Sequence, residues 1–215
     1  MLRRDERGFT LVELLVAIVI MGIIAVPLGN VIISYLHNTD ATTARLSESH
    51  DAQISAAYFS ADAASIGVRS TTYSSDPSAP YPLTQSIEQN APATGGLFPC
   101  GTAATPNAVI RFGWDDYTTG AVGTPTRMRV AYLSETDASG QAQLHRVVCA
   151  GSASITTDTV LAHNLVAVSA SCTPAPCSGS GAALPLAVEL ALTIHDPQST
   201  DTTYHLNLTG QRRQS

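Results

Sequence analysis

A single acidic residue interrupts the most apolar stretch of this 215-residue chain. From Phe9 to Leu36, Glu13 and the phenol of Tyr35 are the only side chains that can ionise. An acid at the centre of a bilayer costs roughly 2.5 to 3.5 kcal/mol on insertion scales, and somewhat less near a helix end. Because a carboxylate in apolar surroundings needs a paired cation, Glu13 is a candidate for a charge-pairing contact.

The apolar stretch is long enough to cross a membrane. As a helix, residues 9–36 would extend roughly 42 Å, against about 30 Å for the hydrocarbon core of a bilayer. A secretory signal has a shorter apolar region followed by a small-residue cleavage site, so removal of the whole stretch is not expected. Arg3, Arg4 and Arg7 precede the stretch and the next basic residue is Arg45, which predicts a cytoplasmic N-terminus and an extracytoplasmic head.

The sequence G-F-T-L-V-E from Gly8 to Glu13 resembles the N-terminus of type IV prepilins and type II secretion pseudopilins. The resemblance implies cleavage between Gly8 and Phe9 by prepilin peptidase, and methylation of the new amine on Phe9. It also implies that Glu13 pairs with the Phe9 amine of an adjacent subunit during assembly. The expected partners are therefore the peptidase, other pilins or pseudopilins, the pilus assembly platform and the membrane.

Two functions of different classes fit this N-terminus. An uncleaved signal anchor could tether an exported binding or hydrolytic domain. The junction favours a minor pilin or pseudopilin instead: a non-enzymatic filament subunit that crosses the cytoplasmic membrane once and later lies in a pilus or pseudopilus at the cell surface. Type IV pili, competence pili and type II secretion share the pattern, so the machine itself stays open.

The helix is expected to continue beyond the span. Gly22, Ala25 and Gly29 form a small-residue strip suited to close helix packing in lipid. Pro27 either kinks or loosens the helix, or is simply tolerated within a membrane helix. The 3- and 4-residue spacing of Ile54, Ala57, Tyr58, Ala61 and Ser65 predicts an amphipathic continuation over residues 37–68. Several threonines near residues 38–43 leave a break there possible.

The remaining residues, 69–215, are predicted to form a β-rich head. Residues 70–96 are rich in Ser, Thr and Pro and suggest a loop. Five or six antiparallel strands are expected after it, among residues 108–114, 127–134, 143–150, 164–172, 184–195 and 203–211. Four segments are therefore predicted: a leader at 1–8, a transmembrane and assembly helix at 9–36, an amphipathic helix at 37–68 and a head at 69–215.

A sheet with one apolar face needs a cover, and the amphipathic helix is the available one. The expected fold class is α+β, a pilin-like long N-terminal helix packed on an antiparallel sheet. Head segments such as AAYFSADAASIGV at 56–68 and LPLAVELALTIHD at 184–196 resemble the J-type minor pseudopilins and similar minor pilins. That resemblance implies a place in the tip complex that initiates a filament.

The four cysteines all lie in the part predicted to be outside the cytoplasm. An even count in an exported domain suggests disulfides, and the short Pro-containing loop between Cys172 and Cys177 favours pairing these two, which leaves Cys100 with Cys149. Zinc ligation and reduced buried thiols are the alternatives.

Other chemistry is poorly supported by the sequence. The six histidines show no compact ligand spacing, and no nucleophile elbow or phosphate-binding loop occurs, so no cofactor and no enzymatic activity are expected. Asp115 and Asp116 are weak calcium candidates, since adjacent acids are more often a solvated turn. The chain is acidic, with a net charge of −6, and has no basic stripe, so direct nucleic-acid binding is not expected.

Overall fold

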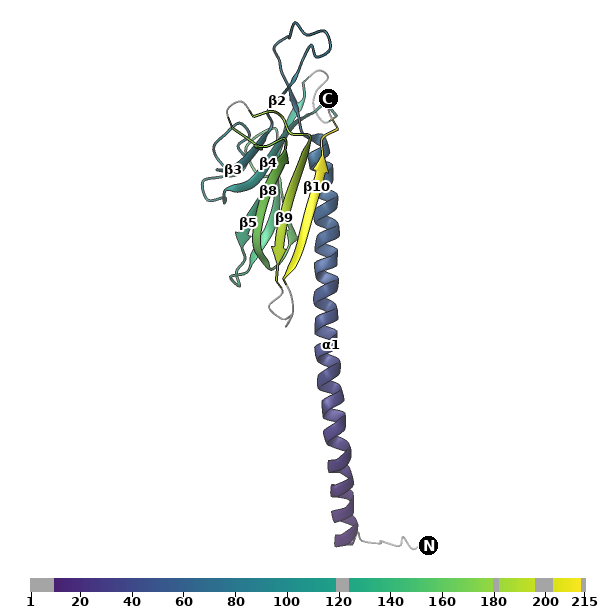
Figure 1. Cartoon of the computed structure of the whole chain (residues 1–215). Coiled ribbons are helices and arrows are strands. Elements are labelled where there is room, and N and C mark those ends of the chain that lie inside the picture. The colour runs from purple at the N-terminus through teal and green to yellow at the C-terminus, as the bar shows by residue number, and fades with distance from the viewer. Residues whose placement is uncertain (1–9, 119–123, 180–181, 196–202, 214–215) are drawn as a thin grey trace, which may run out of the picture. The chain divides into compact units, whose positions relative to one another are not determined.

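The computed structural model describes residues 10–118, 124–179, 182–195 and 203–213. The chain divides into two compact units, Met1–Arg45 and Leu46–Ser215. One helix, α1 (Leu11–Ser65), contributes residues to both. The fold class is α+β and pilin-like, as predicted: a long N-terminal helix followed by antiparallel sheets (Figure 1).

Helix α1 runs without interruption through the two places where the sequence left a disturbance open. Pro27 lies inside the helix. Around residues 38–43, the hydroxyls of Thr39, Thr42 and Thr43 each donate to the carbonyl four residues earlier, at 2.8 to 2.9 Å. These bonds return the hydroxyls to the helix's own backbone, so the threonines do not break the helix there.

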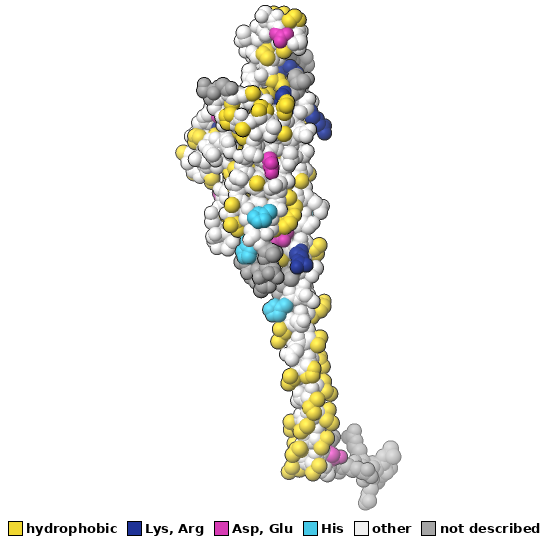
Figure 2. Space-filling view, viewed as in Figure 1, with side chains coloured by type: hydrophobic (Ala, Val, Ile, Leu, Met, Phe, Trp, Pro, Cys, Tyr) yellow, Lys and Arg dark blue, Asp and Glu magenta, His cyan; other side chains and the backbone are white. Residues whose placement is uncertain are grey.

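In the first unit, the helix buries almost none of its apolar surface. Its large apolar side chains are all exposed, from Leu11 at 80% to Leu36 at 55%. Figure 2 shows hydrophobic side chains over the visible face of this segment. The helix is long and apolar enough to cross a membrane, with a mean hydropathy of 2.8 in its most apolar window. Such a surface requires lipid or other helices around it.

The second unit contains two larger sheets and one small one, all antiparallel. The five-stranded sheet has the order β3-β4-β5-β6-β7, with β3 Ile87–Ala91, β4 Ala108–Asp116, β5 Thr126–Thr136, β6 Ala142–Ala150 and β7 Thr157–Ala162. The three-stranded sheet has the order β10-β9-β8, with β8 Leu165–Thr173, β9 Ala187–Ile194 and β10 Tyr204–Gln211. The small sheet pairs β1 (Val68–Arg69) with β2 (Leu83–Thr84).

The C-terminal part of α1 is the centre of the main core. Phe59, Ala63 and Ile66 are fully buried in it. The Phe59 ring lies 5.8 Å from that of Phe112 on β4 and 5.3 Å from that of Tyr132 on β5. Strand β10 also approaches this helix closely (Figure 1), because a Cβ on Gly210 would lie 2.2 Å from that of Ala63. The helix thus covers one face of both sheets, as the sequence predicted.

The buried stripe of the helix differs from the predicted one. Ala57, Tyr58 and Ala61 are exposed, whereas the buried stripe consists of Asp51, Ser55, Phe59, Asp62 and Ala63, with Ile66 buried just after the helix ends. Most of that stripe is polar because its polar side chains bond to the head: the Ser55 hydroxyl, for example, donates to the Leu161 carbonyl at 3.1 Å. In a sequence, polar residues that bond across a helix–sheet interface cannot be distinguished from polar residues that face solvent.

The strand prediction was incomplete. The segment 70–96, expected to be a loop, contains β2 and β3, and β7 was not predicted as a separate strand. Strand β3 carries the buried carboxylate of Glu88, which the Arg111 guanidinium binds at 2.7 Å. A strand whose polar residues are satisfied by a distant partner lacks the apolar alternation that predicts a strand.

Candidate functional site

The first residues that the structure describes form the start of helix α1, where the side chains of Thr10 and Glu13 bond to each other and to the backbone. The Thr10 amide and hydroxyl both donate to Oε2 of Glu13 at 2.9 Å, and the Glu13 amide donates back to the Thr10 hydroxyl at 3.3 Å. This reciprocal pattern is a capping box, which satisfies amide groups that the first helical turn leaves without partners. Glu13 therefore stabilises the start of its own helix.

The charge of Glu13 has no cation near it among the described residues. Its described bonds both reach Oε2 and come from the neutral Thr10. The surrounding side chains, Leu11, Val12 and Leu14, are apolar and exposed. Oε1 is thus available to a donor from outside the described part of the chain. Gly8 and Phe9, the predicted cleavage and methylation residues, lie outside the described residues.

The small-residue strip on the same helix is open. A Cβ on Gly22 or on Gly29 would meet no atom within 4 Å. Neither glycine is needed for packing within the chain, so both fit close approach by another helix.

Residues 3–29 match the family model of the prokaryotic N-terminal methylation motif. The chain has a prepilin-type N-terminus. The motif spans Gly8, Phe9, Glu13 and the open glycines, and it is consistent with the type IV prepilin and pseudopilin family. A prepilin-type N-terminus implies processing by prepilin peptidase and assembly with other pilins, and with the apolar helix it fits a single-pass membrane anchor. No curated protein and no solved structure matches the chain significantly.

The four cysteines of this pilin-like chain form the two predicted disulfides. Cys100 is bonded to Cys149, and Cys172 is bonded to Cys177. The first bond lies in a second core on the outer face of the five-stranded sheet, together with Ala108, Ala131, Leu133 and Val147. It fastens the 92–107 segment to β6. Since all four thiols are used, the zinc and free-thiol alternatives are not supported.

The two calcium candidates do not form a common site. Asp115 is paired with Arg127 on the neighbouring strand β5. Asp116 closes a local turn, in which it accepts the Thr118 amide at 2.8 Å and the Thr118 hydroxyl at 2.6 Å. As adjacent strand residues, the two aspartates point to opposite faces of the sheet. Each of the two carboxylates therefore already has a bonding partner within the protein.

The sequence shows no compact ligand spacing among the histidines, but three of those described form hydrogen bonds to side chains on other elements. The His163 ring and amide both bond to Asp51 on α1, at 2.9 and 3.0 Å. His205 bonds to the Thr193 hydroxyl on the neighbouring strand, at 3.2 Å. His145 bonds to Asp158 at 2.8 Å. Compact sequence spacing could not have revealed these contacts because each joins different elements.

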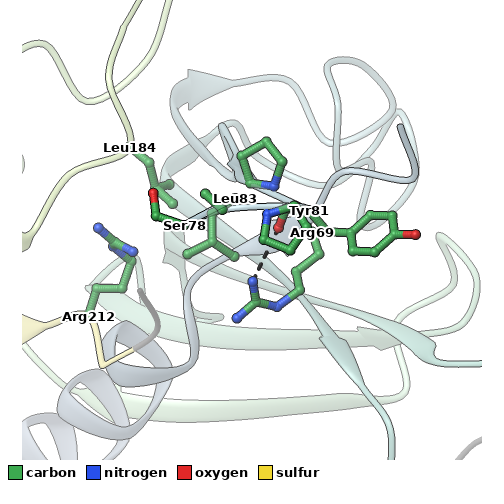
Figure 3. Close-up of a pocket in the computed structure, with 9 residues that line it drawn as sticks. Arg69, Ser78, Tyr81, Leu83, Leu184 and Arg212 are labelled. Carbon is green, nitrogen blue, oxygen red and sulfur yellow. Dashed lines mark hydrogen bonds between the residues drawn. The ribbon is translucent and has the colours of Figure 1, made fainter. Parts of the chain in front are cut away.

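A surface pocket of about 570 Å³ lies beside the small sheet. Figure 3 shows Arg69 and Arg212 on either side of Leu83, and the Arg69 guanidinium donates to the Tyr81 carbonyl at 3.2 Å. The other labelled lining side chains are Ser78, Tyr81 and Leu184. No histidine, cysteine or acid is among the described residues that line the pocket, and the Ser78 hydroxyl donates to the Asp76 carboxylate at 2.7 Å within its own turn.

Proposed function

We propose that this chain is a minor pilin or pseudopilin, a non-enzymatic structural subunit of a type IV pilus-like filament. Prepilin peptidase cleaves it after Gly8, and Phe9 becomes the methylated N-terminus. One observation carries the proposal: the methylation motif at residues 3–29 leads directly into a helix whose apolar part buries almost nothing within the chain. A filament bundles many such helices, which gives this surface a partner after it leaves the lipid.

The proposed orientation is a cytoplasmic N-terminus and an extracytoplasmic head. The arginines of the leader favour the cytoplasmic side. Two disulfides in the head support an oxidising compartment for that part of the chain. The assembly platform then draws the processed subunit from the cytoplasmic membrane into a filament at the cell surface.

Glu13 has a second function in this proposal, beyond capping its helix. The capping box uses Oε2, and Oε1 accepts the Phe9 amine of the neighbouring subunit. One carboxylate thus serves its own helix and the contact between subunits at once. An unpaired charge in the apolar bundle is costly, so pairing selects the correct register between subunits.

The minor, tip-initiating role rests on the J-type resemblance of the head segments. The sequence segments that carry this resemblance follow one another along the chain in the same order as in those proteins. A tip subunit is present in few copies, whereas a shaft subunit repeats along the filament. Quantitative mass spectrometry of sheared filaments therefore tests this part: a low ratio to the main pilin is expected, and an equal ratio would contradict it.

The assembly role is tested by replacing Glu13 with Ala or Gln in cells that make the filament. We expect both variants to be processed after Gly8 but to be strongly depleted from sheared filaments relative to the membrane fraction, because the Phe9 amine then lacks its counter-charge. Glu189→Gln, a change of an acid in the β9 strand of the head, is the matched control and should assemble normally. A Glu13→Ala protein that assembled as well as the wild type would rule out the pairing role.

A further inference from the structure

Three metal-ligating side chains meet on the outer face of the five-stranded sheet. Glu135, His145 and Asp158 each offer one ligand atom, and these atoms all lie within 4.8 Å of one another. The His145 Nδ1 and an Asp158 carboxylate oxygen are 2.8 Å apart. This cluster is remote in sequence from the N-terminal motif and is independent of the filament proposal.

The strand register explains why the three residues meet. They lie on adjacent strands β5, β6 and β7, with His145 on the middle strand. His145 pairs with Leu133, two residues before Glu135, and Val147, two residues after His145, pairs with Asp158. Side chains two residues apart on a strand point to the same face, so all three project from one surface.

The middle strand β6 provides no arginine on the face of the sheet that carries the cluster. Arg146 follows His145 on β6 but points to the opposite face, where Asp62 binds its guanidinium at 2.7 Å. Glu135 is exposed, and the Asp158 side chain is 46% exposed. Two carboxylates close together repel each other, and a divalent cation between them would remove that repulsion.

We propose that Glu135, His145 and Asp158 bind a divalent transition-metal ion of the zinc class. One imidazole nitrogen and two carboxylate oxygens suit such an ion, whereas calcium and magnesium prefer ligand sets made of oxygen alone. Around a tetrahedral zinc ion, ligand atoms lie about 3.3 Å apart. The 2.8 Å between His145 and Asp158 is shorter than this value and the 4.8 Å limit for the three atoms is longer, so the exposed carboxylates must adjust to bind an ion. Water completes the coordination.

His145 is the anchor of the site. Its side chain is only 15% exposed and stands on a strand paired on both sides, so its position is set by the sheet. The two carboxylates close onto the ion from the neighbouring strands.

Isothermal titration of the untagged, processed full chain in detergent micelles with zinc chloride tests the proposal. We expect saturable binding of one ion per chain, and weakening by at least about tenfold in His145→Gln. His205→Gln, on β10 of the other sheet, is the matched control and should bind as the wild type does. Absence of saturable zinc binding, or equal affinity in His145→Gln, would overturn the site.

A second measurement guards against a folding defect in His145→Gln. Glu135→Gln and Asp158→Asn change exposed side chains, and the fluorescence of Trp114, the only tryptophan, reports whether the head is intact. We expect both variants to fold and to lose zinc affinity. Cobalt added to the wild type should give the visible absorption of a site with nitrogen and oxygen ligands. Folded carboxylate variants that bind zinc like the wild type would contradict the proposal.

Discussion

At the scale of single residues, Asp62 connects the helix to the sheet through three hydrogen bonds. Its carboxylate accepts the Tyr132 hydroxyl at 2.6 Å and two bonds from Arg146 at 2.7 Å. The Arg146 guanidinium also lies over the ring of Tyr58, 4.7 Å from its centre. The interactions of Asp62 are therefore structural, and they join α1 to β5 and β6.

Replacing Asp62 with Ala should strongly destabilise the head. Removal of one partner from a buried ion pair costs about 3 to 5 kcal/mol, because the other charge is left buried. Asp62 and Arg146 fit this case, since their side chains are only 6% and 12% exposed. Denaturant unfolding followed by Trp114 fluorescence measures the change. Asp76→Ala, in an exposed loop, is the control, and an equal effect of both substitutions would contradict this account.

The buried Tyr132 should make the stability of the head depend on pH in the alkaline range. Burial, followed by the charge of Asp62, raises the pKa of Tyr132 well above its ordinary value. The unfolded chain then releases the tyrosine proton at a lower pH than the folded chain does. Tyr132 contributes full stability below its unfolded pKa of about 10, and this contribution decreases as the pH rises above that value.

Unfolding of wild type and Tyr132→Phe at several pH values checks this prediction. The wild type should lose more stability than Tyr132→Phe between neutral pH and the range above about pH 10. Identical pH profiles would show that Tyr132 ionises equally in both states.

Some of these residue contacts could be predicted from the sequence, and others could not. Glu13 and its partner Thr10 are three positions apart, so local chemistry identifies them. Asp62 and Arg146 are separated by 84 positions, so the residues around Asp62 in the sequence do not reveal its partner. Glu135, His145 and Asp158 come together only through strand register, which composition does not reveal.

At the scale of elements, the approach of β10 to α1 depends on one glycine. A Cβ on Gly210 would lie 2.2 Å from that of Ala63 and 3.3 Å from the Phe59 carbonyl oxygen. Neither neighbour is a flexible side-chain end, so the strand or the helix must move. A larger residue here would therefore separate the C-terminal strand from the helix that covers it.

Gly210→Ala is accordingly expected to destabilise the head by about 1 to 3 kcal/mol, the usual cost of overpacking a core. Thr209→Ala changes the preceding residue, whose side chain is exposed, and should have little effect. Thermal unfolding of the head followed by circular dichroism compares the two. A Gly210→Ala protein as stable as the wild type would show that the contact is looser than described.

The strands that were predicted have an apolar alternation within their own sequence, whereas the strands that were missed do not. Strand β9 alternates buried and half-buried residues along its whole length, and its sequence alone predicts it. Strand β3 has a buried glutamate, and the edge strand β7 begins with the exposed residues Thr157 and Asp158. Both are strands because a distant neighbour pairs with them, and single-sequence patterns contain no such information.

At the scale of the whole molecule, two kinds of surface are joined in one chain. The described residues of the Met1–Arg45 unit expose their apolar side chains almost everywhere, whereas those of the Leu46–Ser215 unit form two buried apolar cores. The first requires a membrane or a helical bundle, and the second folds around its own sheets and disulfides. An uncleaved anchor would share both properties, so processing at Gly8 distinguishes a filament subunit from a tethered domain.

Mass spectrometry of the N-terminus of the membrane-extracted protein distinguishes a processed filament subunit from a tethered domain. We expect a chain that begins at Phe9 and carries one methyl group on its amine. The same preparation from cells without prepilin peptidase should retain the leader through Gly8. A wild-type protein that keeps Met1, or loses only Met1, would contradict the account.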